Sequence, residues 1–523
     1  MKNNHGITLI ALVVTVIVLL ILVGIGISVL TGNNGIIGNS NESKEETEIS
    51  EEKSVVEESV AISMGKDKNG TLKKDTLQTQ IDKITGEGKT EVSEDGEGFY
   101  VYFIESKRYY TIEKDGTVEQ IVMEEADKYP GDITKDKDGN TLAGTEEDPY
   151  QIWCIEDLCT LSNMNNNSDY RVANWYAVKL MVDLDFNSIF SYVNGQLGVD
   201  GEIPSCSSKE ELMDYLKTNG FIPIGNTHDN SFRGTFMGNN HKIENIYINV
   251  STPAGLIGIM ATEQNNYVSD LTITGDIYCT GTTVNMGVGS IIGQLNSGLG
   301  GSSLTTQIRN CTNYATINSV YGGAGGIVGL KSSSSTSCVI QDCANYGIIN
   351  GAEYVGGIIG MGYTNTTVLN CYNEGNVNAK KYAGGIIGDY QSNPATYNCY
   401  NIGKITSDDS AGGIIGWLYW SESEIYNCYN AGSITAPTKG GIIAAANISS
   451  DLLKMENCYY IDTSAEKVVG NLSMDNKAIK YTEAQLISSD FVDILNNYIS
   501  NATIDTSSWK QWEYNPNTYP SFQ

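Results

Sequence analysis

The chain has 523 residues and a formal net charge of −30, with 62 Asp and Glu against 32 Lys and Arg. Phosphate backbones require clustered positive charge, so this composition argues against nucleic acid as a partner. Eleven cysteines are too few for a disulfide-stapled scaffold of this length. The sequence also contains no His-Glu-x-x-His, Gly-x-Ser-x-Gly or phosphate-loop motif, and we expect no bound metal, no cofactor and no enzymatic activity.

The chain begins with a short leader, residues 1–6, followed by a long apolar run. Ile7 to Leu30 carries no charge over 24 residues. As a helix this run would rise about 36 Å, which is enough to cross a bilayer. No Ala-x-Ala cleavage site follows it. We therefore predict that residues 7–40 form a transmembrane or filament-core helix that attaches the protein to a membrane.

The leader Lys2-Asn3-Asn4-His5-Gly6 before Ile7-Thr8-Leu9-Ile10 resembles that of type IV prepilins. The resemblance implies that a prepilin peptidase cuts between Gly6 and Ile7, that Ile7 is methylated, and that the helix contacts the membrane or other pilin subunits. Pilins usually carry Glu at the fifth mature position, where this chain has Ala11. Without that carboxylate a buried terminal amine would stay unpaired, which favours a minor or tip pilin, or an anchor outside any filament, over a shaft subunit.

Residues 41–128 predict helices followed by a small sheet. The segments 41–66 and 71–85 favour helix, with breaks near Gly65 and Gly70. The segments 99–104 and 108–121, with a turn at Asp115-Gly116, predict antiparallel strands. A helix joined to a small α+β sheet resembles a reduced pilin head.

Residues 129–149 are polar and predict a linker. Asp136, Asp138, Asn140 and Glu147 fall at positions one, three, five and twelve of an EF-hand loop, but Thr141 stands where the turn needs Gly. A solvated turn is therefore expected, with calcium binding as the alternative.

Residues 150–230 are expected to cap the N-terminal end of a repeat region. Apolar residues at 152, 155, 158 and 161 predict a short helix, and alternation over 178–186 predicts a half-buried strand. A capping box at residues 208–211 predicts a further helix that ends near Gly220.

Residues 231–460 contain two motifs with one common period of about 28 residues. The cysteine of an Asn-Cys-Tyr-Asn-like motif recurs at 311, 343, 371, 399, 428 and 458, and Gly-Gly-Ile-Ile-Gly-like motifs recur at 325–329, 356–360, 384–388, 412–416 and 440–444. Short β-favouring runs between Asn-x-Gly turns leave no room for helical repeats. The pattern predicts a mainly β fold, a right-handed parallel β-helix solenoid with three β-faces in each coil.

In such a solenoid equal positions lie above one another, so Asn residues should form ladders and the Ile pairs a continuous core. The Gly-Gly pairs are expected to permit positive φ at a corner. Cys279 and the six motif cysteines are expected to share one repeat position as stacked thiols, with disulfides between neighbouring coils as the alternative. Whether Cys and Tyr of the motif point inward or outward stays open. The repeats resemble the GLUG-motif repeats of bacterial surface proteins.

Residues 461–523 are expected to cap the other end. The segment 482–499 predicts a helix, and the aromatic residues Trp509, Trp512, Tyr514, Tyr519 and Phe522 predict a lid over the last coil.

Aromatic residues beside the Gly-Gly-Ile-Ile-Gly motifs are the candidate binding residues. Five of them follow the motif and are expected to align on one edge: Tyr363, Tyr390, Trp417, Tyr419 and Trp420. Tyr354 and Tyr382 precede it. Rigid aromatic rows suit binding of sugar rings or proteins, although mutual packing at a corner is the alternative. Asp389, Asp408 and Asp409 are the nearest candidates for catalytic carboxylates and are expected to be solvated loop acids.

These patterns together predict a cell-surface, membrane- or pilus-anchored, adhesin-like β-helix in bacteria. Its repeats would be extracellular and present a face that binds a surface glycan or a host protein. The alternatives are a surface-anchored enzyme acting on polysaccharides and a structural spacer without a ligand.

Overall fold

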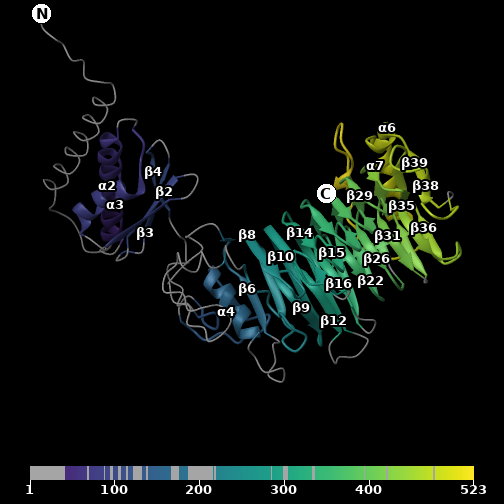
Figure 1. The fold of residues 1–523 in the computed structure, drawn as a ribbon, viewed down its shortest axis with the longest axis horizontal. Coiled ribbons are helices and arrows are strands. Elements are labelled where there is room, and N and C mark those ends of the chain that lie inside the picture. The colour runs from purple at the N-terminus through teal and green to yellow at the C-terminus, as the bar shows by residue number, and fades with distance from the viewer. Residues whose placement is uncertain are drawn as a thin grey trace, which may run out of the picture. The chain divides into compact units, whose positions relative to one another are not determined.

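The computed structural model describes residues 42–67, 70–86, 89–94, 98–103, 106, 108–113, 116–121, 132–136, 139–166, 176–186, 216, 220–283, 286–297, 304–332, 336–393, 395–419, 422–474 and 477–523 (Figure 1). The predicted cleavage site at Gly6 and Ile7, the apolar run Ile7–Leu30 and the capping box at 208–211 lie outside these residues. Within them, no helix has both the length and the apolar character needed to cross a membrane. The chain divides into two compact units, Met1–Asp127 and Lys128–Gln523.

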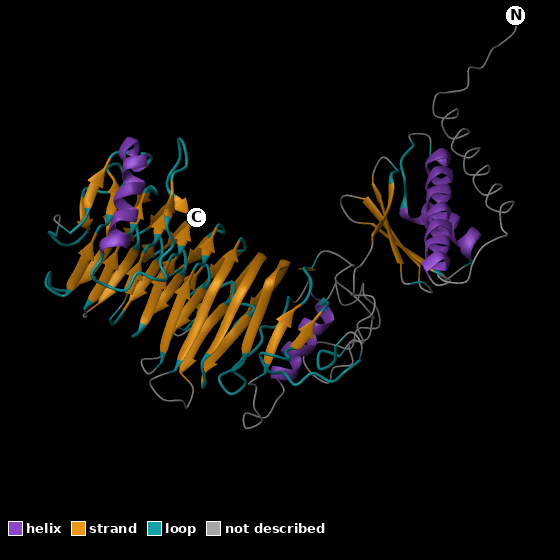
Figure 2. Cartoon of the chain, turned by 180° about the vertical axis from the view of Figure 1, so that it is seen from behind, coloured by secondary structure: helices purple, strands orange, loops and turns teal. Residues whose placement is uncertain are grey.

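The first unit contains the predicted helices and small sheet (Figure 2). Its elements are α2 (Glu42–Lys66), α3 (Lys74–Thr85), β1 (Thr90–Glu94), β2 (Gly98–Phe103), β3 (Arg108–Glu113) and β4 (Val118–Ile121). The four strands pair antiparallel in chain order. Val60 of α2 and Ile81 of α3 belong to one buried cluster with Val101 and Tyr110 of the sheet.

The second unit is a solenoid of about nine coils in which consecutive coils pair through parallel strands. This finding confirms the predicted mainly β fold and parallel β-helix; its right-handedness stays a prediction. The first sheet contains β5 (Tyr150–Ile152), β6 (Ala177–Leu180), β7 (Leu184–Asp185), β8 (Thr235–Val250), β10 (Asn266–Cys279), β13 (Thr305–Asn313), β14 (Thr316–Ser319), β17 (Ser337–Gln341), β18 (Ala344–Asn345), β19 (Ile349–Gly351), β22 (Thr366–Leu369), β23 (Tyr372–Asn373), β24 (Val377–Ala379), β27 (Ala395–Tyr397), β28 (Tyr400–Asn401), β29 (Ile405–Ser407), β32 (Ser423–Tyr426), β33 (Tyr429–Asn430), β34 (Ile434–Thr435), β36 (Leu453–Glu456), β37 (Tyr459–Ile461) and β39 (Ile479–Tyr481).

The second sheet joins two parallel ladders through the long strand β35. Its strands are β9 (Ile257–Thr262), β11 (Gly287–Val288), β12 (Ile292–Ser297), β15 (Gly323–Gly325), β16 (Val328–Lys331), β20 (Tyr354–Gly356), β21 (Ile359–Gly362), β25 (Tyr382–Gly384), β26 (Ile387–Tyr390), β30 (Ser410–Gly412), β31 (Ile415–Tyr419), β35 (Thr438–Asn447) and β38 (Lys467–Val469). A central coil such as residues 366–390 therefore has five short strands instead of three faces, because it bends again at its Asn and Gly turns.

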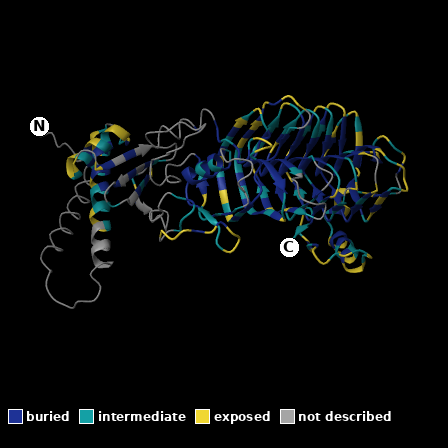
Figure 3. Cartoon of the chain, turned by 90° about the horizontal axis from the view of Figure 1, so that it is seen from below, coloured by how far each residue is buried: buried dark blue, intermediate teal, exposed yellow. Residues whose placement is uncertain are grey.

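Isoleucine and cysteine side chains fill the interior of the coils. Figure 3 shows that the solenoid strands are largely buried. Ile386 and Ile387, which follow the paired glycines, are both fully buried. The motif cysteines are fully or almost fully buried free thiols in the same core. Cys371 points into this core, whereas Tyr372 packs in a second cluster on the outside, which answers the orientation left open by the sequence.

One cysteine departs from the predicted row. In the parallel register Cys311 lies beside Leu271, whereas Cys279 lies beside Ser319, eight residues further along the coil. The prediction that Cys279 shares the repeat position is wrong, because the spacing of 32 residues back from Cys311 ignores the longer coil between them.

Buried asparagines form the predicted inner ladder across five coils. Each side-chain amide donates to the Oδ1 atom of the next asparagine at 2.6–2.7 Å, in the order Asn313, Asn345, Asn373, Asn401 and Asn430. Each donor also bonds a carbonyl two residues along its own chain, as Asn373 does to Gly375 at 2.9 Å. The ladder ends where Tyr460 replaces the asparagine opposite Asn430.

The predicted positive φ at the paired glycines is wrong. Among the described residues, left-handed backbone occurs instead at the Asn or Asp before each motif cysteine, with φ of 52° at Asn398 and 57° at Asn427. The glycines are needed for close approach, since a Cβ atom on Gly357 would lie 2.5 Å from Cγ of Asn373. Asparagine tolerates the left-handed region better than other non-glycine residues, which explains its recurrence before cysteine.

The N-terminal end of the solenoid is covered by α4 (Ile155–Asn166), which corresponds to the predicted short helix. Ile155, Leu158 and Leu161 belong to the solenoid core cluster. Parallel pairing already begins with β5 and β6, upstream of residue 231, so the region expected as a cap also supplies coils.

The C-terminal region differs from the predicted lid. The expected helix is split into α6 (Glu483–Leu486) and α7 (Ser489–Asn501), because Ser488 caps the second helix by accepting from the Phe491 N–H. Beyond α7, the antiparallel pair β40 (Trp512–Glu513) and β41 (Ser521–Phe522) lies against the flank of several coils. Its aromatic residues pack on tyrosines that the coils display outward, a surface that no end lid could cover.

Candidate functional site

Each coil turns a corner at its Gly-Gly pair, between two strands of the second sheet. In one coil β25 leads through Gly385 into β26, and in the preceding coil β20 leads through Gly357 into β21. Tyr354 pairs in register with Tyr382 on the arms before the corner. On the arms after it, Asp389 lies between Met361 and Trp417. Residues on the strands before and after the Gly-Gly turn therefore lie close together in successive coils.

Four aromatic side chains, which we call the aromatic corner, form a continuous series across these coils: Tyr354, Tyr382, Trp417 and Tyr419. The rings of Tyr354 and Tyr382 stack with centroids 5.7 Å apart and an interplanar angle of 8°. Trp417 lies 4.9 Å from Tyr382, and Tyr419 lies 6.4 Å from Trp417. Three of the four side chains are half-buried and Tyr419 is 38% exposed, so the series presents ring surface to solvent.

Asp389 lies in register beside Trp417 of the aromatic corner and is fully buried. Its Oδ2 atom accepts from Nε2 of Gln391 at 2.9 Å, whereas its buried Oδ1 atom has no hydrogen-bond partner. Burial raises the pKa of the Asp389 carboxyl to about 7, against the opposing effects of that hydrogen bond and of the Lys381 charge. An unsatisfied carboxyl oxygen of this kind is costly, so its presence calls for an explanation.

The charge of Asp389 acts on the phenol groups of the aromatic corner. Burial, and then the charge of Asp389, raises the pKa of Tyr354, and Asp409 and Asp389 add to the effect of burial at Tyr382. Lys381 Nζ lies 5.3 Å from the ring centroid of Tyr382 and 6.0 Å from that of Tyr354. The aromatic corner therefore combines aromatic rings, the Lys381 cation and the buried carboxyl of Asp389.

The structure places the five predicted binding residues differently from one another. Trp417 and Tyr419 belong to the aromatic corner. Tyr363 is half-buried, and its charge acts on Tyr354. Tyr390 is fully buried in the solenoid core, so its assignment to an exposed row is wrong. Trp420 lies outside the described residues.

The register explains the error at Tyr390. Counted from the last glycine of the motif, Tyr390 is in register with Gly362 and Leu418, and all three positions point inward. Trp417 is instead in register with Asp389. The same count, applied to the sequence, would have separated Tyr390 from Tyr363.

Asp389 also differs from the expected solvated loop acid, because it lies in β26 and is buried. Asp408 and Asp409 are exposed, as expected. The EF-hand-like segment forms a small turn in which both carboxylate oxygens of Asp136 accept from Asn140. Among the described residues, no group of three His, Cys, Asp or Glu side chains is arranged to hold a metal ion.

Comparison with known proteins gives little further guidance. No protein-family model matches the sequence, and no curated protein matches it significantly. Among solved structures, the chain is similar to a Bacteroides ovatus protein described as a "putative immunoglobulin A1 protease", with 18% identity and a TM-score of 0.42. The likeness covers 73% of this chain and 95% of that chain. A likeness at this level carries no inference about activity, and the solenoid assignment stands on the strand pairings.

Proposed function

We propose that the protein is a surface-anchored β-solenoid that binds a glycan at the aromatic corner. The observation that carries the proposal is the stacked series Tyr354, Tyr382 and Trp417, in which Trp417 lies in register beside Asp389. Sugar rings present apolar C–H faces that pack on aromatic rings. The stacking fixes the rings before binding, which lowers the entropic cost of ordering them.

A second feature supports glycan over protein as the ligand. The series follows the coil stacking, so its rings repeat along the solenoid axis at 4.9–5.7 Å. A polymer of repeating sugar units can contact several of these rings at once, and each added contact strengthens binding by raising the effective concentration of the next.

A glycan array with the full chain tests the proposal. Wild-type protein is expected to bind a subset of polysaccharides, and Trp417→Ala is expected to lower the affinity at least tenfold. Tyr314→Ala, which removes an exposed tyrosine from another part of the coil, is the matched control and should bind normally. Equal binding by wild type and Trp417→Ala would remove the aromatic corner as the ligand face.

The raised pKa of Asp389 favours a second candidate function, cleavage of the bound glycan. A carboxyl with a pKa of about 7 is suited to donate a proton at neutral pH. Glycoside hydrolysis needs a second carboxylate across the bond, and Glu353 and Asp409 are the acids whose charges reach the same tyrosines. New reducing ends from a bound glycan, lost in Asp389→Asn, would identify an enzyme; intact glycan would leave a binding protein.

Anchoring at the cell surface is the remaining part of the proposal and depends on the N-terminal residues. The leader ending at Gly6 supports cleavage by a prepilin peptidase, and Ile7 to Leu30 supports retention in the membrane. Ala11 supports a minor or tip position, or an anchor without a filament. Co-expression with a prepilin peptidase should yield a mature chain beginning at methylated Ile7, and a chain that retains Met1 would contradict the processing step.

A further inference from the structure

A second row of polar side chains runs along the outside of the coils, at the turn before each motif cysteine. We call it the outer ladder, and its members are Asp270, Asn310, Asp342, Asn370, Asn398, Asn427 and Asn457. All of them have left-handed backbone with φ between 50° and 57°. Neighbouring side chains hydrogen-bond along the row, as Asn398 Nδ2 does to Asn370 Oδ1 at 2.8 Å and Asn310 Nδ2 does to Asp270 Oδ1 at 2.8 Å.

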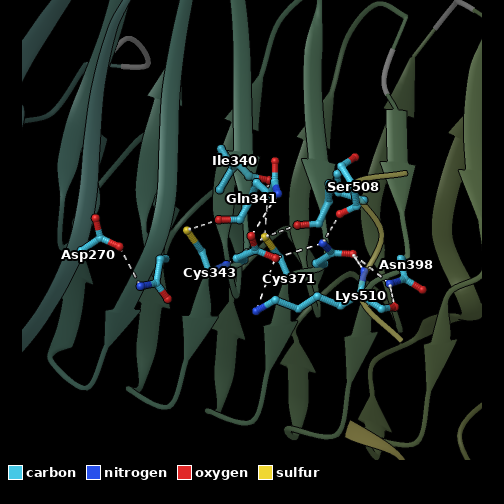
Figure 4. A network of polar contacts seen from close by, with 12 residues as sticks. Asp270, Ile340, Gln341, Cys343, Cys371, Asn398, Ser508 and Lys510 are labelled. Atoms are coloured by element: carbon cyan, nitrogen blue, oxygen red, sulfur yellow. Dashed lines mark hydrogen bonds and ion pairs between the residues drawn. The ribbon is translucent and has the colours of Figure 1, made fainter. Parts of the chain in front are cut away.

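The chain's own C-terminal segment shows what this ladder can bind (Figure 4). Asn370 donates to the Ser508 carbonyl at 2.9 Å and accepts from the Lys510 N–H at 3.1 Å. Asn398 donates to the Lys510 carbonyl at 3.0 Å and accepts from the Trp512 indole N–H at 2.8 Å. The amides of Asn370 and Asn398 therefore each pair with a donor and an acceptor of a segment that crosses the coils. Lys510 Nζ also reaches Asp342, at 3.4 Å.

The outward tyrosines beside the ladder complete this docking surface. Trp512 and Phe522 pack on Tyr400, and Phe522 also packs on Tyr372. The Tyr429 hydroxyl donates to the Pro520 carbonyl. Under this cover Asn370 and Asn398 are at most 1% exposed.

The outer ladder and the tyrosines beside it continue over the earlier coils, where the C-terminal segment does not cover them. Asn310 is exposed and Tyr314 is 51% exposed. Tyr314 stacks on Tyr346 at 4.7 Å and 5°, and the Tyr346 hydroxyl lies 2.8 Å from that of Tyr372, so the aromatic surface is continuous with the covered part. The backbone conformation at Asn310 is also that of the covered asparagines.

The uncovered part differs in charge, because Asp270 and Asp342 replace asparagine. Lys510 of the C-terminal segment already forms an ion pair with Asp342. The neighbouring cation, Arg309, is held over the Tyr267 ring at 4.4 Å. A ligand that extends along these coils would therefore meet an acidic ladder bordered by two exposed or half-exposed tyrosine rings.

We propose that the uncovered coils, from Asp270 to Tyr346, bind an extended peptide segment of a partner protein that carries a basic and an aromatic side chain two residues apart. The spacing is that of Lys510 and Trp512 in the segment bound to the covered coils. The peptide amides pair with Asn310, the basic group pairs with Asp270, and the aromatic ring packs on Tyr314. This site lies in the first sheet and its turns, apart from the aromatic corner, and does not depend on glycan binding.

A labelled peptide of sequence Ser-Ser-Trp-Lys-Gln-Trp, which copies residues 507–512, serves as the probe. Fluorescence anisotropy with the full chain in detergent is expected to show saturable binding that weakens at high salt. A peptide with Glu in place of Lys should bind at least tenfold more weakly. No saturable binding of the Lys peptide, or equal binding of both peptides, would overturn the proposal.

Four variants, one of them a matched control, separate this site from displacement of the chain's own C-terminal segment. Asn310→Gly removes the amide but keeps the left-handed backbone, and Asn365→Gly, at an exposed residue with φ of 57°, is its matched control. We expect at least tenfold weaker binding for Asn310→Gly and for Tyr314→Ala, and unchanged binding for Asn365→Gly. Asp270→Asn, which keeps the shape of the ladder, should reduce the preference for Lys over Glu. Binding that Asn310→Gly and Tyr314→Ala leave unchanged would place the peptide elsewhere and contradict the proposal.

Discussion

Gly385 and Asn401 are in direct contact across the interior of two successive coils. A Cβ atom on Gly385 would lie 2.5 Å from Cγ of Asn401, and Gly357 stands in the same relation to Asn373. The second glycine of the Gly-Gly-Ile-Ile-Gly motif therefore packs directly against the last asparagine of the Asn-Cys-Tyr-Asn motif. This contact explains why both motifs share one period: a change in either would leave a clash or a void in every coil.

Substitution of Gly385 by alanine should destabilise the solenoid by about 3 kcal/mol, because the added methyl meets the Asn401 side chain and the Gly413 carbonyl, neither of which can move without breaking the ladder. The shift in the urea midpoint, followed by circular dichroism, measures the effect. Gly65→Ala is the control, since its Cβ would have no atom within 4 Å and it lies in a helix. Alanine there should be neutral or stabilise by up to about 1 kcal/mol. A tolerated Gly385→Ala would mean that close packing at the corner is not required.

The inner ladder should be more important for stability than its hydrogen-bond count suggests. Asn401 is fully buried, bonds Asn430 at 2.7 Å and accepts from Asn373 at 2.7 Å. Asn401→Ala leaves buried partners unpaired and should cost about 3 kcal/mol. Asn378→Ala removes a similar bond to Asn350 at a half-buried position and should cost about 1 kcal/mol. Equal midpoints for the two variants in urea would contradict this ranking.

The stacked thiols should resist modification in the folded protein. Cys371, Cys399 and Cys428 are fully buried, and burial raises the pKa of the Cys371 and Cys428 thiols well above the ordinary value. All ten described cysteines are buried, so iodoacetamide should not reach them in native buffer and should alkylate them in denaturant. Mass spectrometry of the digested protein distinguishes the two cases. Rapid native alkylation of Cys371 or Cys399 would show that the core opens readily.

The parallel β-helix was predictable because its determinants are periodic. Stacked coils place equal residues above one another, and the recurrence of Asn, Cys, Gly and Ile records that contact directly in the sequence. Single residues were harder to place. Tyr390 and Tyr363 both follow a Gly-Gly-Ile-Ile-Gly motif, but a difference of one residue in register sends Tyr390 into the core.

The C-terminal docking could not be read from the sequence for a different reason. The segment around Trp512 has no period, and its contacts with Asn398 join residues more than one hundred positions apart. The aromatic composition of the C-terminal segment indicated that it packs on the solenoid. Only the register of the outer ladder shows which coils it covers. The burial of Asp389 likewise depends on rings contributed by other coils.

Titration of Asp389 should make the solenoid less stable as the pH rises from about 4 to about 7. Its folded-state pKa of about 7 lies above the value of 3.8 for an exposed carboxyl, so in this window the folded chain keeps a proton that the unfolded chain releases. The stabilising contribution is complete below pH 4 and is lost as the pH passes 7, amounting to about 4 kcal/mol at most. Asp389→Asn mimics the protonated carboxyl and should remove this slope.

The difference between wild type and Asp389→Asn isolates this group, because Asp157, whose pKa burial also raises to about 7, contributes equally to both proteins. Urea midpoints should nearly coincide at pH 4, and the variant should be the more stable protein at pH 8. A glycan that hydrogen-bonds to the ionised carboxyl would lower the pKa of Asp389 and so release a proton on binding at pH 6. If the urea midpoints of the two proteins change with pH in parallel, Asp389 is solvated or ion-paired in the folded chain. The inference that Asp389 is a buried, unsatisfied acceptor at the aromatic corner would then be wrong.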